Sequence, residues 1–146
     1  MNKLNIGCGD TWKVHKGFDG IDIRDFGQKY VADILGEEGL KRFEDNSFDE
    51  VRAQHCIEHF DQDEVIYIMN QVHRILKKDC MFRVCVPDKN HPYAYAIGHK
   101  TIWTEGTFKW FEREDMWPVY GVKRWKIDWM NTNERPDIHC YLKPVK

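Results

Sequence analysis

Short apolar runs that surround a single amphipathic helix constrain the fold of this chain more than any other feature. The runs occupy residues 4–6, 20–23, 31–34, 48–53 and 81–86. The helix begins near Asp61, which can cap it while Glu64 reaches back, and its apolar residues recur every three or four positions as far as Leu76. This order of elements predicts an α/β fold with a mainly parallel sheet.

The last third of the chain predicts a covering segment followed by a hairpin. Residues 88–118 are irregular and rich in aromatic side chains, and we expect one short helix in them, at 107–111. Residues 122–130 and 138–142 predict two strands joined by 131–137. The first of these strands has alternating apolar residues, Trp125, Ile127 and Trp129. We expect this hairpin to end the sheet.

Length and composition predict one soluble domain over residues 1–146. No apolar run approaches the roughly 20 residues of a membrane span, and no secretory signal is present, so we expect a cytoplasmic protein without a membrane partner. A net charge of −2 argues against nucleic acid as a partner. The five cysteines form no Cys-x-x-Cys pair, which predicts reduced thiols and no bound metal.

A glycine-containing turn follows the first apolar run, at Asn5, Gly7, Cys8 and Gly9. Glycine allows a sharp turn and a close approach of a ligand to the backbone. Taken alone, such a turn is as easily explained by a sharp bend of the backbone as by a bound ligand. A nicotinamide dinucleotide would favour a third glycine where this chain has Trp12, which argues against that cofactor.

Two carboxylates at the ends of the next two runs favour a nucleoside ligand. Asp22 precedes Ile23, and Asp33 precedes Ile34. A carboxylate after the second strand can accept both hydroxyl protons of a ribose, and Asp33 can accept from an adenine amino group. Together with the glycine turn, these residues predict a nucleoside site rather than solvated acids.

The ordered motifs of residues 4–88 resemble the class I S-adenosylmethionine-dependent methyltransferases, in particular small bacterial or phage proteins of the type 11 group. The motifs are Asn-Ile-Gly-Cys-Gly at 5–9, Gly-Ile-Asp-Ile at 20–23, Ala-Asp-Ile at 32–34, Asp-Asn-Ser-Phe-Asp-Glu-Val at 45–51, His-Cys-Ile-Glu-His-Phe at 55–60, His-Arg-Ile-Leu-Lys-Lys at 73–78 and Phe-Arg-Val-Cys-Val-Pro-Asp at 82–88. The resemblance implies a Rossmann-like, seven-stranded sheet of order 3-2-1-4-5-7-6 with an antiparallel last strand.

The resemblance also implies the cofactor, S-adenosyl-L-methionine, and its binding residues. The glycine turn lies along the methionine part, Asp22 takes the ribose, Asp33 and Ile34 border the adenine, and Gln54 with His55 closes the methionine side. The full set is Asn5, Gly7, Cys8, Gly9, Asp22, Ile23, Asp33, Ile34, Gln54 and His55.

Two departures from the family pattern affect this site. Ten residues separate Gly9 from Gly20, so the helix after the glycine turn has one or two turns, and Lys13 or His15 is expected to meet the cofactor's carboxylate. The sequence enters its first strand at once, without the family's N-terminal cap. We therefore expect an open site, or one closed by a second copy or by a partner protein.

His55, Glu58 and His59 also match the His-x-x-Glu-His pattern of a metal hydrolase. That pattern requires a helix through 55–59 and a third ligand, whereas here a strand ends near residue 53 and the helix cap comes at Asp61. We therefore favour a loop after the fourth strand.

For methyl transfer, the expected catalytic residues are His55, Asp88 and His59, near the ends of the fourth and fifth strands. Tyr93, Tyr95 and Trp103 are the aromatic residues expected to contribute to an acceptor pocket. The expected reaction is methyl transfer to a small-molecule or glycan-linked acceptor, such as a sugar. The alternative is a non-catalytic module that binds S-adenosylmethionine or a partner.

Overall fold

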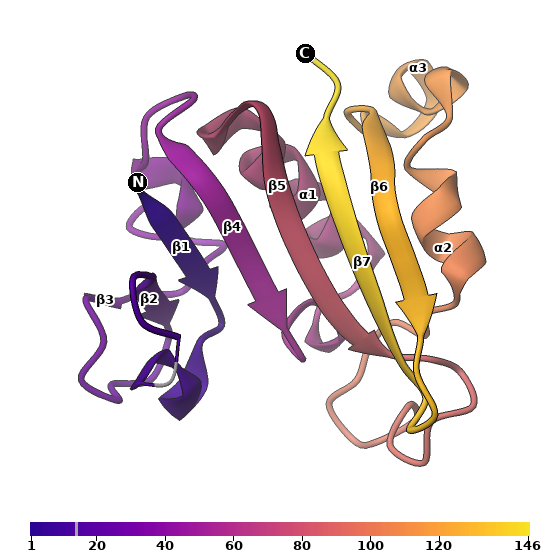
Figure 1. The fold of residues 1–146 in the computed structure, drawn as a ribbon, viewed down its shortest axis with the longest axis horizontal. Coiled ribbons are helices and arrows are strands. Elements are labelled where there is room, and N and C mark those ends of the chain that lie inside the picture. Colours follow the sequence, from indigo (N-terminus) through magenta and orange to yellow (C-terminus); the bar gives the residue numbers. More distant parts are fainter. Residues whose placement is uncertain (14) are drawn as a thin grey trace.

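A seven-stranded sheet of order β3-β2-β1-β4-β5-β7-β6 forms the frame of the protein (Figure 1). The computed structural model describes residues 1–13 and 15–146. The strands are β1 (Lys3–Ile6), β2 (Asp19–Asp22), β3 (Tyr30–Val31), β4 (Phe48–Gln54), β5 (Leu76–Pro87), β6 (Trp125–Thr132) and β7 (Asp137–Pro144). Only β7 runs antiparallel to its neighbours β5 and β6. The predicted strand order and the terminal hairpin are therefore confirmed.

Helix α1 (Gln62–Ile75) begins as its sequence predicts. The Asp61 carboxylate accepts a hydrogen bond from the Glu64 backbone at 2.9 Å, and the Glu64 carboxylate accepts one from the Asp61 backbone at 2.8 Å. Val65, Ile68 and Val72 lie on one buried stripe and hold the helix against the sheet. The other helical elements are short: η1 (Gly9–Lys13), η2 (Leu40–Arg42), η3 (Ile57–His59), α2 (Glu105–Trp110), η4 (Glu114–Met116) and α3 (Trp117–Tyr120).

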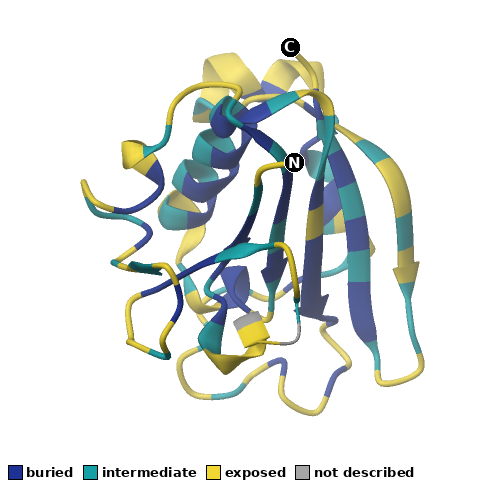
Figure 2. Cartoon of the chain, turned by 60° about the vertical axis from the view of Figure 1, so that its left-hand side comes forward, coloured by how far each residue is buried: buried dark blue, intermediate teal, exposed yellow. Residues whose placement is uncertain are grey.

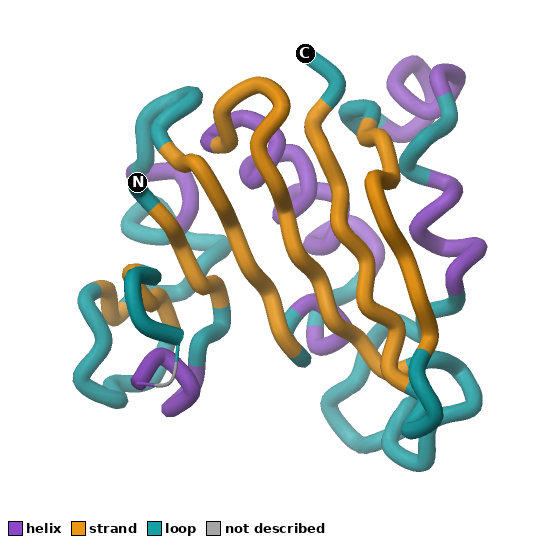
Figure 3. Tube along the Cα trace, viewed as in Figure 1, coloured by secondary structure: helices purple, strands orange, loops and turns teal. Residues whose placement is uncertain are grey.

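The two faces of the sheet differ in what covers them. Helix α1 lies behind β5, and no α-helix of the described chain crosses the front of the sheet in Figure 1. Figure 3 shows the same face of the sheet as a Cα trace, with the helix behind the strands. On β5 the side chains of Phe82 and Val84 are buried beneath the helix, whereas Arg83 between them is exposed. Burial therefore alternates over residues 82–84, as it does in sheets that are solvated on one face, whereas the end of the strand, residues 84–87, is buried throughout.

Strand β6 departs from the predicted alternation. Trp125 is fully buried, but Trp129 is half exposed, because the register with β7 shifts between Ile127 and Trp129. Such a bulge moves the following side chains to the opposite face. The prediction that the three residues share a face is wrong for Trp129, which packs on Tyr141 with ring centroids 4.9 Å apart.

The connections in the first third of the chain are turns and loops rather than long helices. The turn η1 follows β1, as the short spacing predicts, and a 3-10 turn, η2, is the helical element between β3 and β4. Strand β3 is shorter than the predicted run at 31–34 and ends before Asp33. Figure 2 shows much of this region as exposed or partly exposed chain. Within the described residues, no helix has the length and apolar character needed to cross a bilayer.

Candidate cofactor and acceptor site

A cavity of about 500 Å³ opens at the carboxyl ends of β1 and β2, bordered by the loop after β4. Its size lies within the usual range for small-molecule sites, about 300–1,000 Å³. Seven residues predicted from the sequence line it: Gly7, Asp22, Ile23, Asp33, Ile34, His55 and His59. Ligands of open α/β sheets bind at this edge, so the position agrees with a nucleoside site.

Of the two glycines of the turn, Gly7 lines the cavity and Gly9 does not. Gly7 has φ +58°, and a Cβ there would collide with the Sγ atom of Cys56. Gly9 has φ +52°, but an added Cβ would meet no described atom within 4 Å. Gly7 is therefore required by the protein's own packing, whereas the space beside Gly9 is open. Burial raises the pKa of the nearby Cys8 thiol to about 11, so Cys8 is uncharged at neutral pH.

Asp22 both orders the turn and faces the cavity. Its Oδ2 atom accepts a hydrogen bond from the Gly9 N–H at 2.9 Å, and its Oδ1 atom accepts one from the Arg24 N–H at 3.0 Å. An ionised carboxylate has about four lone-pair positions, so two backbone donors leave room for ribose hydroxyls. The residue is 7% exposed. These contacts fit the role expected for Asp22 toward S-adenosylmethionine.

Asp33 and Ile34 form the neighbouring wall. The Asp33 Oδ1 atom accepts from the Leu35 N–H at 3.0 Å, which fixes the carboxylate while the side chain stays exposed at the cavity. Ile34 is 5% exposed and supplies an apolar surface beside it. An apolar wall with one acceptor suits a flat base that carries an amino group.

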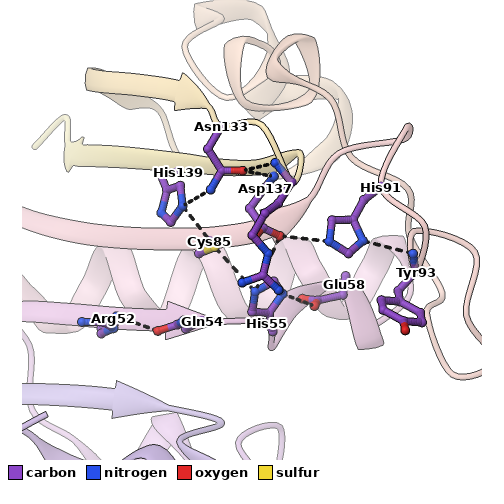
Figure 4. A network of polar contacts seen from close by, with 11 residues as sticks. Arg52, Gln54, His55, Glu58, Cys85, His91, Tyr93, Asn133, Asp137 and His139 are labelled. Carbon is purple, nitrogen blue, oxygen red and sulfur yellow. Dashed lines mark hydrogen bonds and ion pairs between the residues drawn. The ribbon is translucent and has the colours of Figure 1, made fainter. Parts of the chain in front are cut away.

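Several predicted residues lie outside the cavity lining. Asn5 is 1% exposed within the sheet, Cys8 is buried beneath the turn, and Gly9 is not among the lining residues. Gln54 lies toward the uncovered face, where its Oε1 atom accepts a hydrogen bond from Arg52 at 2.6 Å (Figure 4). Asp88 accepts from the Asn90 N–H at 2.9 Å and so shapes the loop after β5.

Neither cation proposed for the cofactor's carboxylate lies among the lining residues. Lys13 is exposed at the end of η1. His15 contacts Gln54, and its pKa is lowered by partial burial and by the charge of Arg52. The Arg and Lys side chains that do line the cavity are those of Arg24 and Lys100.

His55 lies at the boundary of the cavity and of a polar network (Figure 4). Its backbone has φ +48°, and its ring lies between Glu58, 3.5 Å from Nδ1, and Asp137, 3.7 Å from Nε2. The Cys85 thiol, 3.8 Å from Nε2, and the Glu58 carboxylate raise the pKa of His55 to about 10. The surroundings of this ring therefore favour positive charge.

The metal-hydrolase alternative lacks the helix that it needs. Residues Ile57–His59 form a single 3-10 turn, and α1 begins only at Gln62. His59 packs against His99, with ring centroids 4.6 Å apart, rather than toward the group that His55 faces. The two histidines of the pattern thus lie in different clusters.

Sequence reasoning missed six lining residues: Arg24, Leu35, Cys56, Phe60, Glu64 and Lys100. Four of them are adjacent in the sequence to a predicted residue, so their closeness to the motifs could have indicated them. Lys100 had no such signal, because it comes from the segment after β5. Its backbone N–H donates to the Glu58 carbonyl at 2.8 Å, which ties that segment to the cavity.

A second, aromatic cavity of about 350 Å³ lies between α1 and the segment 101–120. Trp103, predicted for an acceptor pocket, lines this cavity together with Trp110 and Phe111. Tyr93 and Tyr95 line neither cavity and are 68% and 71% exposed. The predicted aromatic residues are therefore split between the core and the surface.

Comparison with known proteins gives matches to methyltransferases. Residues 22–84 match a family model described as a methyltransferase domain. A search of curated proteins found no match. Among solved structures, a SAM-dependent methyltransferase from Archaeoglobus fulgidus superposes with a TM-score of 0.71 at 18% identity, over 97% of this chain and 85% of the other.

Two further structures have the same fold. A putative methyltransferase of Haloferax volcanii, solved in complex with the Trm112 activator, gives a TM-score of 0.69 at 13% identity, over 99% of this chain and 83% of its own. The 1,6-didemethyltoxoflavin-N1-methyltransferase of Burkholderia thailandensis, solved with S-adenosylhomocysteine, gives 0.67 at 13% identity, over 99% and 71%. Residues 22–84 are thus similar to a methyltransferase domain, and the whole chain has the fold of these SAM-dependent methyltransferases.

Proposed function

We propose that the protein binds S-adenosylmethionine in the cavity beside the glycine turn and transfers its methyl group to a small polar or glycan-linked acceptor. The observation that carries the proposal is the shared cavity of Gly7, Asp22, Asp33 and His55 at the carboxyl ends of the strands. When bound, the cofactor supplies a methyl group on a sulfonium, which is open to direct displacement.

The chain's own contribution is to orient the reactants and to exclude water. Asp22 and the backbone at Gly9 hold the nucleoside side, while Asp33 and Ile34 border the base. His55 and His59 lie on the remaining wall and are the side chains proposed to face the acceptor. Asp88 is a positioning residue in this scheme, because its carbonyl accepts the His91 N–H at 2.8 Å and orders the adjoining loop.

The acceptor class is inferred from the groups at the cavity wall and in the adjoining segment. His59, Glu64 and Lys100 provide donors and acceptors for hydroxyl groups. The segment that supplies Lys100 also presents Tyr93 and Tyr95 to solvent, and such rings offer a flat apolar body with a polar tip. These features suit a sugar or another polyhydroxylated molecule.

Calorimetric titration with S-adenosylmethionine tests the cofactor site, with two aspartates of β2 as a matched pair. Asp22→Asn removes charge at the cavity and should weaken binding about 10- to 100-fold. Asp19→Asn, at the other end of the strand, removes only a surface pair with Lys29 and should leave the affinity unchanged. Equal affinities for the two variants would contradict the assignment.

A non-catalytic role remains the second candidate, favoured by the short turn η1 and by the absence of Lys13 and His15 from the lining. Incubation with methyl-labelled cofactor and a panel of sugars, nucleotide sugars and small hydroxylated compounds separates the two. Label transfer that is lost in His59→Ala supports the enzyme. Tight cofactor binding without transfer to any acceptor supports the binding module.

A further inference from the structure

Three potential metal ligands meet beside the cofactor cavity although they are far apart in the sequence. His55 follows β4, Cys85 lies near the end of β5, and Asp137 begins β7 (Figure 4). Their ligand atoms, one from each residue, all lie within 4.8 Å of one another. The strand order places these ends side by side, because β5 pairs with both β4 and β7.

Asp137 is the first sign that a cation belongs here. Its side chain is 5% exposed, and its Oδ1 atom has no hydrogen-bond partner among the described residues. The other oxygen lies 3.6 Å from the Nε atom of the exposed Arg135, and the contacts of Oδ1 are the rings of His55 and His91, at 3.7 and 3.6 Å. A buried carboxylate oxygen held by such long contacts is costly, and bound metal is one of the ways to compensate it.

The spacing of the ligand atoms fits a tetrahedral ion. Bonds of about 2.3 Å to sulfur and about 2.0–2.2 Å to nitrogen or oxygen place neighbouring ligands of a zinc ion about 3.3–3.6 Å apart. The His55 Nε2 atom lies 3.8 Å from the Cys85 Sγ atom and 3.7 Å from the Asp137 Oδ1 atom. These two distances exceed the expected ones by a few tenths of an ångström, and the third pair, the Cys85 thiol and the Asp137 carboxylate, lies within 4.8 Å.

Glu58 provides the outer contact that a metal-binding histidine usually has. It is 1% exposed, neither of its carboxylate oxygens has a hydrogen-bond partner in the described part of the chain, and Oε1 lies 3.5 Å from the His55 Nδ1 atom. A carboxylate on Nδ1 leaves Nε2 free to bind the ion and increases its basicity.

His91 has a different role from the three ligands. Its Nδ1 atom accepts a hydrogen bond from the Tyr93 N–H at 3.0 Å, so in the neutral ring Nε2 carries the proton. That nitrogen lies 3.6 Å from the Asp137 Oδ1 atom, where it helps to position the carboxylate. His91 therefore positions Asp137 and is not counted among the ligands.

We propose that His55, Cys85 and Asp137 bind one zinc ion, with Glu58 orienting His55. Thiolate, imidazole and carboxylate together are a donor set typical of zinc, and three protein ligands with one open position are typical of sites that bind a water or a substrate atom. The sequence-based expectation of no metal rested on the lack of a Cys-x-x-Cys pair. A site assembled from one residue on each of three separated segments leaves no such pattern.

Cobalt titration of the full-length, chelator-treated and reduced protein tests this site without any measurement of activity. One equivalent of Co²⁺ should produce the near-ultraviolet thiolate-to-cobalt band together with visible tetrahedral bands, and added Zn²⁺ should displace both. Cys85→Ser should abolish the thiolate band. Cys80→Ser, a matched change outside the cluster, should leave it intact.

Two further variants guard against a folding defect in Cys85→Ser. Asp137→Asn should weaken Zn²⁺ binding by at least about 10-fold, and Glu58→Gln by about 10- to 100-fold, with the circular dichroism spectrum unchanged. Failure to bind Co²⁺ would overturn the site. Co²⁺ binding without a thiolate band would also overturn it and would point to the thiol-free cluster of Glu58, His59 and His99. A thiolate band that persists in Cys85→Ser would assign the band to another cysteine and would overturn the site as well. The calorimetric cofactor titration is a separate measurement, so the zinc site can fail while the proposed function stands.

Discussion

The two halves of the sheet are built differently although they meet at one cavity. Strands β1, β2 and β3 have four, four and two residues, whereas β4, β5, β6 and β7 have seven, twelve, eight and eight. The short strands lead into the glycine turn and into the two carboxylates proposed to bind the nucleoside, Asp22 and Asp33. The long strands pack against α1 and the aromatic segment.

The two halves share one apolar core, and the short-strand half adds polar contacts to it. In the long-strand half, fully buried apolar side chains such as Phe82, Trp125 and Ile68 fill the space between sheet and helix. In the short-strand half, Leu4, Ile6 and Ile21 are also fully buried. In addition, the side chains of Asp22 and Gln28 there bind backbone groups of the loops. The difference teaches that the geometry of the cavity depends on polar contacts of the loops, in addition to the apolar core that both halves share.

The largest expected effect comes from emptying the long-strand core. Phe82→Ala removes a ring that is fully buried and lies 5.7 Å from the Trp125 ring. We expect the free energy of unfolding to fall by about 3–5 kcal/mol, measured by urea denaturation. Tyr95→Ala, which removes a 71% exposed ring, should change it by less than about 0.5 kcal/mol. Similar losses in both variants would mean that the core does not dominate stability.

The two glycines of the turn sharpen the comparison within the short-strand half. Gly7→Ala forces a Cβ against Cys56 at positive φ and should cost about 3 kcal/mol of stability. Gly9→Ala meets open space and should cost only about 1 kcal/mol, from its positive φ. Because the proposed cofactor would fill the open space beside Gly9, we expect Gly9→Ala to lower S-adenosylmethionine affinity in calorimetry although it changes stability little. An unchanged affinity would place the cofactor elsewhere.

Sequence patterns predicted the parts of this molecule that depend on local order. The capping box of α1, the glycine turn and the carboxylate after β2 are each set by residues that are close in the sequence. The strand order came with the family resemblance and is confirmed. The lining role of Asp22 and Asp33 required only that neighbouring parallel strands end at one edge.

Features that depend on distant contacts left no local pattern. The bulge in β6 that exposes Trp129 depends on pairing with β7, and periodicity alone does not encode it. Gln28 lies in a polar loop, yet it is 6% exposed because the backbone folds around it. The meeting of His55, Cys85 and Asp137 follows from the strand order rather than from any spacing.

Gln28 offers the clearest test of how the short-strand half keeps its shape. Its Nε2 atom donates to the carbonyls of Arg24 at 2.8 Å and Tyr30 at 3.2 Å. Gln28→Glu replaces this donor with an acceptor, which should cost about 2 kcal/mol of stability. Because Arg24 and Ile23 line the cavity, we also expect about a 10-fold loss of cofactor affinity by calorimetry.

Gln71→Glu on α1 is the matched control, since its Oε1 atom accepts from Arg74 at 3.0 Å and a carboxylate can do the same. It should leave both quantities unchanged. A Gln28→Glu protein that keeps full affinity would show that the loop is held by other contacts.

The smallest predicted effect is a pH dependence that belongs to the long-strand half. His73 on α1 is 6% exposed, packs on Trp125 at 5.3 Å and has its Nε2 atom 3.0 Å from the Val145 carbonyl oxygen. Burial, with smaller contributions from Lys146 and Lys123, lowers its pKa from 6.5 to about 4. Between about pH 4 and pH 6.5, His73 is protonated in the unfolded chain and neutral in the folded protein, so acid favours unfolding.

Stability from this residue is complete above about pH 6.5 and should fall by about 1 kcal/mol between about pH 7 and pH 5.5. His73→Gln cannot take up the proton and can still donate to the carbonyl, so the difference between the two proteins in urea denaturation should show this slope. The short-strand half contains no part of this contact. After correction for any unfolded protein, the cofactor affinities of the native protein and of His73→Gln should therefore be equal at each pH. Parallel stability curves for the two proteins would show that His73 is protonated in the folded state or that its ring is solvated.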